Sequence, residues 1–114
     1  MRIEDYRFGH LRIDGQTYSA DVIVHGDRVR SPWWRARGHE LAAADLADLL
    51  AQPPRVLVIG TGYHGRMRVL PETLAALQAK GIEVHTRRTG EAVDEFNRLA
   101  AAGRDVAAAL HLTC

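Results

Sequence analysis

One glycine-rich segment of the chain matches a phosphate-binding pattern. Residues Gly60 to Gly65 (Gly-Thr-Gly-Tyr-His-Gly) have the G-x-G-x-x-G spacing of dinucleotide-binding loops and follow a predicted strand. In such loops the third glycine opens a helix whose N–H groups hold the pyrophosphate. Here the next helix signal comes only at Pro71, and the following strand ends in Arg87 and Arg88 instead of the acid that binds an NAD ribose. A tight turn with positive φ is therefore the favoured interpretation, and binding of an anion or a nucleotide phosphate is the alternative.

A second segment has the composition of a recognition surface. Trp33 and Trp34 are adjacent, and Arg35 follows them. Successive side chains of an extended chain point in opposite directions, so we expect one indole to stay partly exposed beside an arginine. The competing interpretation is that both indoles cover the edge of the sheet while Arg35 pairs with a carboxylate such as Asp21.

The histidines and the single cysteine form no catalytic or metal-binding motif. No two of the 6 histidines have the i, i+4 spacing of a zinc pair on a helix. His111 and Cys114 would lie on opposite faces of a strand, and a cysteine nucleophile needs both a base and an orienting group. We therefore predict no catalytic residues, no metal and no cofactor, and consider an enzyme the less favoured class.

The elements that must position these residues differ between the two parts of the chain. Alternating apolar residues flank the turn signal Asp14-Gly15, from Tyr6 to Ile13 and from Thr17 to His25, which predicts a β-hairpin. A second turn at Gly26-Asp27 is followed by a short predicted strand over 28–30.

From residue 41 onward, helices alternate with strands. The predicted elements are helices over 42–52, 71–80 and 90–102, the last with Thr89 as its N-cap, and strands over Val56–Ile59, Ile82–Thr86 and Val106–Leu112. The first and last of these strands are continuous apolar runs, typical of strands covered on both faces. This order predicts parallel strands with right-handed crossovers. We therefore expect one three-layer α/β domain over residues 1–114, with a mostly parallel central sheet, helices and an N-terminal hairpin.

This topology predicts where a site would lie. Ligands of open α/β sheets bind beyond the carboxyl ends of the strands. The loop from Gly60, the segment from Arg87 and the terminal residues 111–114 should meet at that edge, and the loop over 31–39 approaches the same side. The candidate binding residues are Trp33, Trp34, Arg35, Gly60, Thr61, Gly62, Arg87, Arg88 and Thr89.

Composition excludes several classes of partner. The chain has 114 residues, 15 basic and 14 acidic, so it carries no excess of positive charge for nucleic acid. No apolar run approaches the length of a membrane span or a signal peptide, and a lone cysteine suits a reducing compartment. We expect a cytoplasmic protein that binds neither nucleic acid nor membranes.

Several motifs occur here in an order that resembles one family from end to end. They are Tyr6-Arg7-Phe8-Gly9, Trp33-Trp34-Arg35 before Gly38-His39, Gly60-Thr61-Gly62, Phe96-Asn97 and the ending His111-Leu112-Thr113-Cys114. The series resembles the MTH-nine-three-eight-like domain family of unknown function, which includes the mitochondrial complex I assembly factor 3 and an adipogenesis-associated domain protein. The family's pattern has a basic and then an acidic residue after Trp-Trp-Arg, where this chain has Ala36 and Arg37.

The resemblance implies a compact α/β domain with no established enzymatic activity and a role in protein–protein contacts. The leading hypothesis is accordingly a protein-interaction or assembly-type factor that binds a protein partner around Trp33, Trp34 and Arg35. The alternative is a protein, or an enzyme, that binds an anionic small molecule through the loop from Gly60 to Gly65.

Overall fold

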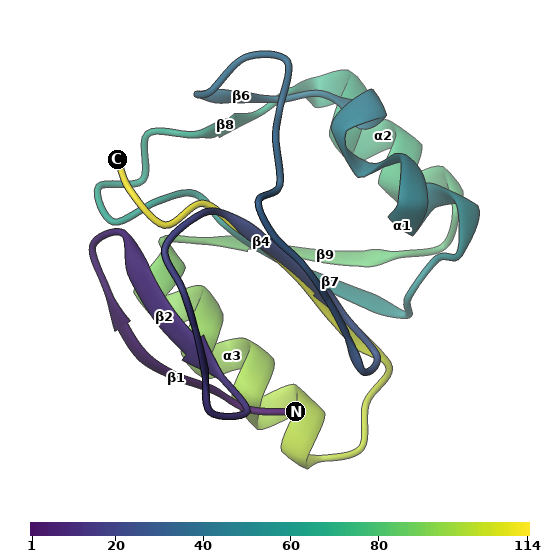
Figure 1. Cartoon of the computed structure of the whole chain (residues 1–114). Helices are drawn as coiled ribbons and strands as arrows, with labels where there is room; N and C mark the ends of the chain where they lie inside the picture. The colour runs from purple at the N-terminus through teal and green to yellow at the C-terminus, as the bar shows by residue number, and fades with distance from the viewer.

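A computed structural model describes residues 1–114, and a five-stranded sheet lies at its centre (Figure 1). The strand order is β5-β4-β10-β7-β9. These strands are β4 (Val22–His25), β5 (Arg28–Arg30), β7 (Val56–Gly60), β9 (Glu83–Arg87) and β10 (Val106–Leu110).

The two apolar runs form adjacent parallel strands inside this sheet, as predicted. Val106 of β10 pairs with Val56 of β7, and every residue of both strands is buried. Their side chains alternate between two core clusters: Val106, Ala108 and Leu110 belong to one, and Ala107 and Ala109 belong to the other. Both faces of the sheet are thus covered, which explains why these strands contain no polar residue.

The prediction of a mostly parallel sheet is wrong. β10 pairs in parallel with β7, and β7 with β9, but β4 pairs antiparallel with both β10 and β5. The predicted strand from Thr17 to His25 is split, and its second part leaves the N-terminal hairpin to join the central sheet. Val22, Ile23 and Val24 are all buried, so they need cover on both faces, and only the central sheet provides it.

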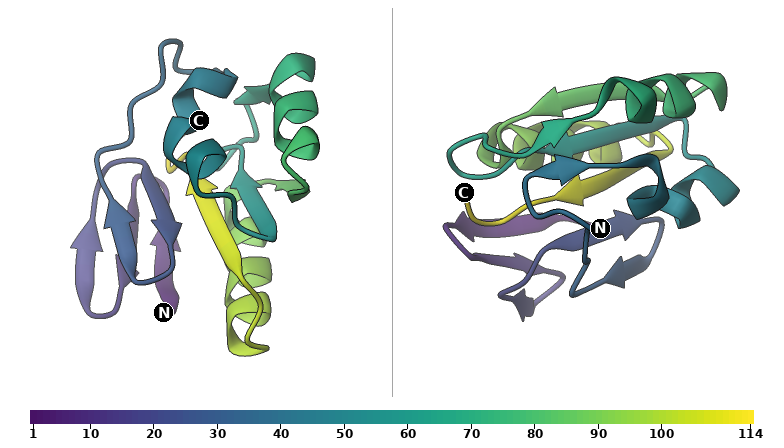
Figure 2. Two further views of the ribbon diagram at one scale, coloured as in Figure 1. Left: turned by 90° about the vertical axis from the view of Figure 1, so that its right-hand side faces the viewer. Right: turned by 90° about the horizontal axis from the view of Figure 1, so that it is seen from above.

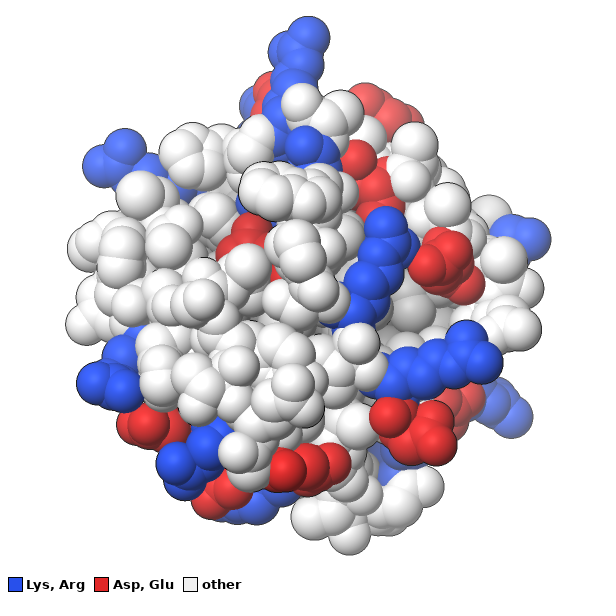
Figure 3. All heavy atoms as spheres, in the orientation of Figure 1, with Lys and Arg blue, Asp and Glu red and all other residues white.

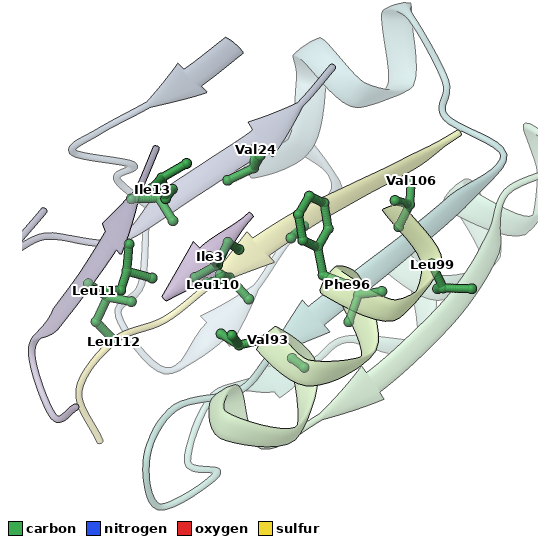
Figure 4. Packing of buried hydrophobic residues seen from close by; sticks show 14 of the residues in the cluster. Ile3, Leu11, Ile13, Val24, Val93, Phe96, Leu99, Val106, Leu110 and Leu112 are labelled. Atoms are coloured by element: carbon green, nitrogen blue, oxygen red, sulfur yellow. The ribbon is translucent and has the colours of Figure 1, made fainter. Parts of the chain in front are cut away.

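The N-terminal residues form a separate antiparallel sheet of three strands, β1 (Ile3–Arg7), β2 (His10–Ile13) and β3 (Gln16–Tyr18). The predicted turn at Asp14-Gly15 joins β2 to β3, and Gly15 has a φ of 83°. This sheet and the helix α3 (Thr89–Ala101) cover the same face of the central sheet. Figure 4 shows Phe96 of α3 pointing into that core, where its side chain is 2% exposed.

The opposite face is covered by short elements (Figure 2). They are β6 (Glu40–Leu41), the 3-10 helix η1 (Ala43–Leu46), α1 (Ala47–Ala51), β8 (Arg68–Val69) and α2 (Pro71–Ala79). The helix predicted over 42–52 begins with a 3-10 turn, as is frequent at helix N-termini, and the Asp45 carboxylate there accepts the N–H groups of Ala42 and Ala36. The strands β6 and β8 had no signal in the sequence.

Candidate functional site

The four segments predicted to meet at the carboxyl ends of the parallel strands do meet there. The N–H and the hydroxyl of Thr61 both donate to the carbonyl of Arg87, at 2.9 and 3.0 Å. The hydroxyl of Thr89 accepts from the Gly62 N–H at 2.8 Å and donates to the carbonyl of His111 at 2.6 Å. These contacts connect the ends of β7, β9 and β10.

Thr89 differs from its predicted role. It is the first residue of α3, while Arg88 is the N-cap and provides no capping side chain. The Thr89 hydroxyl is buried and bridges two strand ends instead of closing its own helix.

The glycine loop uses its N–H groups inside the protein. Tyr63 N–H donates to the carbonyl of Thr113 at 2.7 Å, and Arg66 N–H donates to the carbonyl of Cys114 at 3.0 Å. A Cβ on Gly62 would lie 2.5 Å from the carbonyl carbon of Cys114, and Gly62 has a φ of 115°. The turn interpretation is therefore confirmed. Residues 113 and 114 lie against the loop, and their carbonyls accept N–H groups that a bound phosphate would need.

The arginines of the candidate site do not point at a common ligand. Arg87 lies 3.4 Å from Glu95, and the Arg88 guanidinium donates twice to the carbonyl of Tyr63. Both of these side chains are exposed, whereas Arg35 is buried at another place on the edge.

The two tryptophans have opposite environments. Trp33 is 1% exposed, and its Nε1 donates to the carbonyl of Asp45 at 3.0 Å. Trp34 is 78% exposed. The expectation of one exposed indole is thus confirmed, while the interpretation that both cover the sheet edge is wrong.

Arg35 forms a buried ion pair with Asp21, the carboxylate suggested from the sequence. Nη2 of Arg35 lies 2.8 Å from Oδ2 of Asp21, which also contacts Nδ1 of His111 at 2.8 Å. Oδ1 of Asp21 accepts the Leu112 N–H at 2.8 Å. Burial would raise the pKa of Asp21, but the hydrogen bonds from His111, Leu112 and Arg35 outweigh burial and hold that pKa below its ordinary value. The part played by His111 in this cluster was missed from the sequence.

A second exposed aromatic group was also missed. Phe8, in the β1–β2 turn, and Tyr63, in the glycine loop, are 51% and 47% exposed, and their ring centroids are 5.8 Å apart. His64 lies against both rings, at 6.1 and 5.1 Å. Each aromatic residue stands next to a glycine in the sequence, which was the available signal. Figure 3 shows the molecule in the orientation of Figure 1, and a broad area on the left of that view is free of Lys, Arg, Asp and Glu side chains.

A broad hollow lies away from these residues. It has a volume of about 810 Å³, is open to solvent and is formed by the β4–β5 hairpin and α1. An ion pair of 2.8 Å between Arg30 and Asp48 joins two of its lining residues. A smaller hollow of about 240 Å³, beside Tyr6 and Tyr63, reaches the start of α3.

The structure contains neither a metal-binding cluster nor a membrane-spanning helix. No group of three or more histidine, cysteine, aspartate or glutamate side chains is arranged so that it could hold a metal ion. None of the helices combines the length and the apolar character needed to cross a membrane.

The fold and the edge of its sheet define a class: a mixed α/β domain whose C-terminal residues lie against its own glycine loop. The chain belongs to the DUF498/DUF598 family of proteins of unknown function, whose model matches residues 3–111.

Solved structures agree with this assignment. The protein MT938 is 30% identical with a TM-score of 0.81, over 99% of this chain and 98% of that one. The conserved hypothetical protein PH1505 of Pyrococcus horikoshii is 28% identical with a TM-score of 0.81, over the full length of both chains (100% of each). A protein of Bordetella pertussis, described as an Mth938-like domain, is 25% identical with a TM-score of 0.79, over 97% of this chain and 85% of that one. The resemblance to the MTH-nine-three-eight-like family is thereby confirmed.

Proposed function

We propose that this domain is a protein-interaction module of the assembly-factor type, without catalytic activity, that presents Trp34 to a protein partner. The observation that carries the proposal is the fixed exposure of this indole. Trp34 is 78% exposed, while the residues on either side of it, Trp33 and Arg35, are anchored in the interior by hydrogen bonds and an ion pair.

Such an arrangement suits binding for two physical reasons. Exposed tryptophans are enriched among the residues that contribute most to protein–protein affinity, because one indole buries a large area. A backbone held on both sides of the indole is already ordered before the partner arrives, so little conformational entropy is lost on binding. The exposed pair of Phe8 and Tyr63 adds aromatic surface of the same kind.

The alternative, an anion-binding protein or enzyme that uses the loop from Gly60 to Gly65, has less support. The N–H groups of Thr61, Gly62 and Tyr63 are all donated to protein acceptors. To reach the Tyr63 N–H, a phosphate would have to displace the carbonyl of Thr113. We propose that the module acts in the cytoplasm, because a lone cysteine suits a reducing compartment.

The experiment compares affinity capture by the wild-type chain, Trp34→Ala and a control variant, Gln78→Ala, which alters an exposed residue of α2. We expect one partner to be retained by the wild type and Gln78→Ala and lost by Trp34→Ala. Rebinding of the purified partner should shift the tryptophan emission of the wild type to shorter wavelength. Retention of the partner by the wild type and by both variants would refute the proposal. A rise in melting temperature with phosphate, abolished by Thr61→Leu, would instead support the anion-binding alternative.

A further inference from the structure

Two buried nitrogen atoms at the sheet edge have no hydrogen-bond partner in the protein. They are Nη1 of Arg35 and Nε2 of His111. Their side chains are only 4% and 7% exposed. Buried polar atoms are nearly always paired, because an unpaired one loses its hydration without compensation. The domain has three such atoms; the third, Oε1 of Glu95, lies on α3, and the two nitrogens at the sheet edge require a physical explanation.

Both atoms belong to a single cluster. Nη2 of Arg35 lies 3.1 Å from Nδ1 of His111, and each of these nitrogens lies 2.8 Å from Oδ2 of Asp21. The charges of Asp21 and Arg35 cancel. The unpaired atoms are thus the far ends of two groups that touch each other beside one carboxylate.

The contacts of His111 show which ring nitrogen carries a proton. Nδ1 cannot both accept from Arg35 and donate to Asp21, and a carboxylate has no proton to give, so Nδ1–H donates to Asp21. Nε2 is then an acceptor when the ring is neutral and a donor when it is protonated. Nη1 of Arg35 can only donate.

We propose that Asp21, Arg35 and His111 form a binding site for the carboxyl group of a small organic acid, one oxygen on Nη1 of Arg35 and the other on Nε2 of His111. A carboxyl group can bond both atoms whether the proton is on the acid or on the His111 ring. As the acid it donates O–H to the neutral ring and accepts from Arg35. As the carboxylate it accepts from both Arg35 and the protonated ring. In both cases the anion and one proton enter together, which keeps the buried site neutral.

The position of the cluster suits a ligand. Asp21 lies just before β4 and His111 just after β10, at the edge where open α/β sheets bind their ligands. The Trp33 ring lies 4.8 Å from Cζ of Arg35 and covers one face of the guanidinium. The indole thus covers a face of the guanidinium and leaves Nη1, on its edge, for a hydrogen bond.

A short exposed turn covers the cluster. Nε and Nη2 of Arg35 donate to the carbonyl of Gly38, at 3.1 and 3.0 Å. The exposed His39 ring lies edge-on to His111, with 5.8 Å between centroids. The groups that face His111 are therefore Asp21, Arg35 and His39, and a ligand would enter by displacing the turn.

The test uses sodium formate as the probe and sodium chloride of equal ionic strength as the reference. Near pH 5.5, about 100 mM formate should raise the melting temperature of the wild type by about 4 °C, the shift for binding at about 10 mM affinity. Near pH 8 the rise should fall below about 1 °C, because the proton must then be taken from a more basic solution. His111→Gln should remove the rise at both pH values, and Gln78→Ala, which alters an exposed residue of α2 outside the cluster and its covering turn, should keep it.

A second measurement holds even if His111→Gln fails to fold. In the wild type labelled with 15N, formate should shift the Nε2 resonance of His111 in a saturable way, more at the lower pH. A melting temperature and ring resonances that do not respond to about 100 mM formate would overturn the proposal, as would an equal response at both pH values. Because Trp34 is not part of the cluster, Trp34→Ala should leave the formate response intact, so this proposal and the interaction function can fail separately.

Discussion

Trp33 and Trp34 are neighbours in the chain, yet their side chains are 1% and 78% exposed. The difference follows from the extended loop backbone, which turns successive side chains to opposite sides. Trp33 also has an acceptor for its Nε1–H in the Asp45 carbonyl, so the one polar atom of this buried side chain is satisfied. Trp34 has no such environment, and its exposure is a property of the native loop.

This contrast predicts very different effects on stability. Trp33→Ala removes a large buried side chain and should lower the free energy of unfolding by about 3–5 kcal/mol. Trp34→Ala should change it by no more than about 0.5 kcal/mol, as is usual for surface positions. Urea denaturation of both variants measures this difference. A large destabilisation by Trp34→Ala would mean that the indole packs against the domain.

His85 makes stability depend on pH in a predictable direction. Hydrogen bonds to Glu83 and Glu95 raise the pKa of His85 above its ordinary value. A raised folded-state pKa stabilises the protein fully below the unfolded pKa of about 6.5, and this stabilisation is lost as pH rises through the folded-state value. Urea midpoints of the wild type should therefore fall from about pH 6 to pH 8, and those of His85→Gln should fall less. If the urea midpoints of the wild type and of His85→Gln change equally with pH, the contacts of His85 with Glu83 and Glu95 do not persist in solution.

At the scale of elements, the strongest sequence signals were the most local ones. Val56–Ile59 and Val106–Leu110 could be assigned as central parallel strands because continuous apolar runs require cover on both faces. The two-residue strands β6 and β8 could not be found, since they depend on pairing between residues 40–41 and 68–69. The switch of β4 into the central sheet also depends on a distant partner, β10.

The same distinction applies to the candidate site. That the segments from Gly60, Arg87 and His111 meet at one edge follows from strand topology alone. Strand topology does not predict that the carbonyls of Thr113 and Cys114 accept the N–H groups of the loop. These contacts depend on the path of the chain after β10.

The close approach of the chain end to the loop predicts the effect of a single methyl group. In Gly62→Ala the new Cβ would lie 2.5 Å from the Cys114 carbonyl carbon, at a backbone φ of 115°. Gly26→Ala is the matched control, because Gly26 also has a positive φ, 63°, but nothing lies within 4 Å of its would-be Cβ. The control should cost about 1–2 kcal/mol from backbone strain, and Gly62→Ala clearly more. Amide exchange should also become faster at Tyr63 and Arg66. Equal costs for the two variants would mean that the terminal residues move aside freely.

At the scale of the molecule, the N-terminal sheet is joined to the central one through both packing and hydrogen bonds. Ile3, Leu11 and Ile13 belong to the same buried cluster as Phe96 and the residues of β10. The Asn97 amide accepts from the Ile3 N–H at 2.8 Å and donates to the Ile3 carbonyl at 2.7 Å. Tyr6 and Gly9 both donate to the carbonyl of Leu112, which fixes the β1–β2 hairpin to the chain end.

These connections predict that the two sheets unfold together. Because β1 to β3 have no core of their own, their amides should exchange only through the global opening that also exposes β7 and β10. Asn97→Ala removes both hydrogen bonds to Ile3 and should lower the free energy of unfolding by about 1–3 kcal/mol. The opening free energy measured by exchange should fall by the same amount at the amides of Leu11 and Val58. Native-state hydrogen exchange in low urea measures both. If the N-terminal sheet is instead a separate unit, Asn97→Ala will accelerate exchange at Leu11 and leave Val58 unchanged, because only the opening that detaches β1 from α3 will then have become easier.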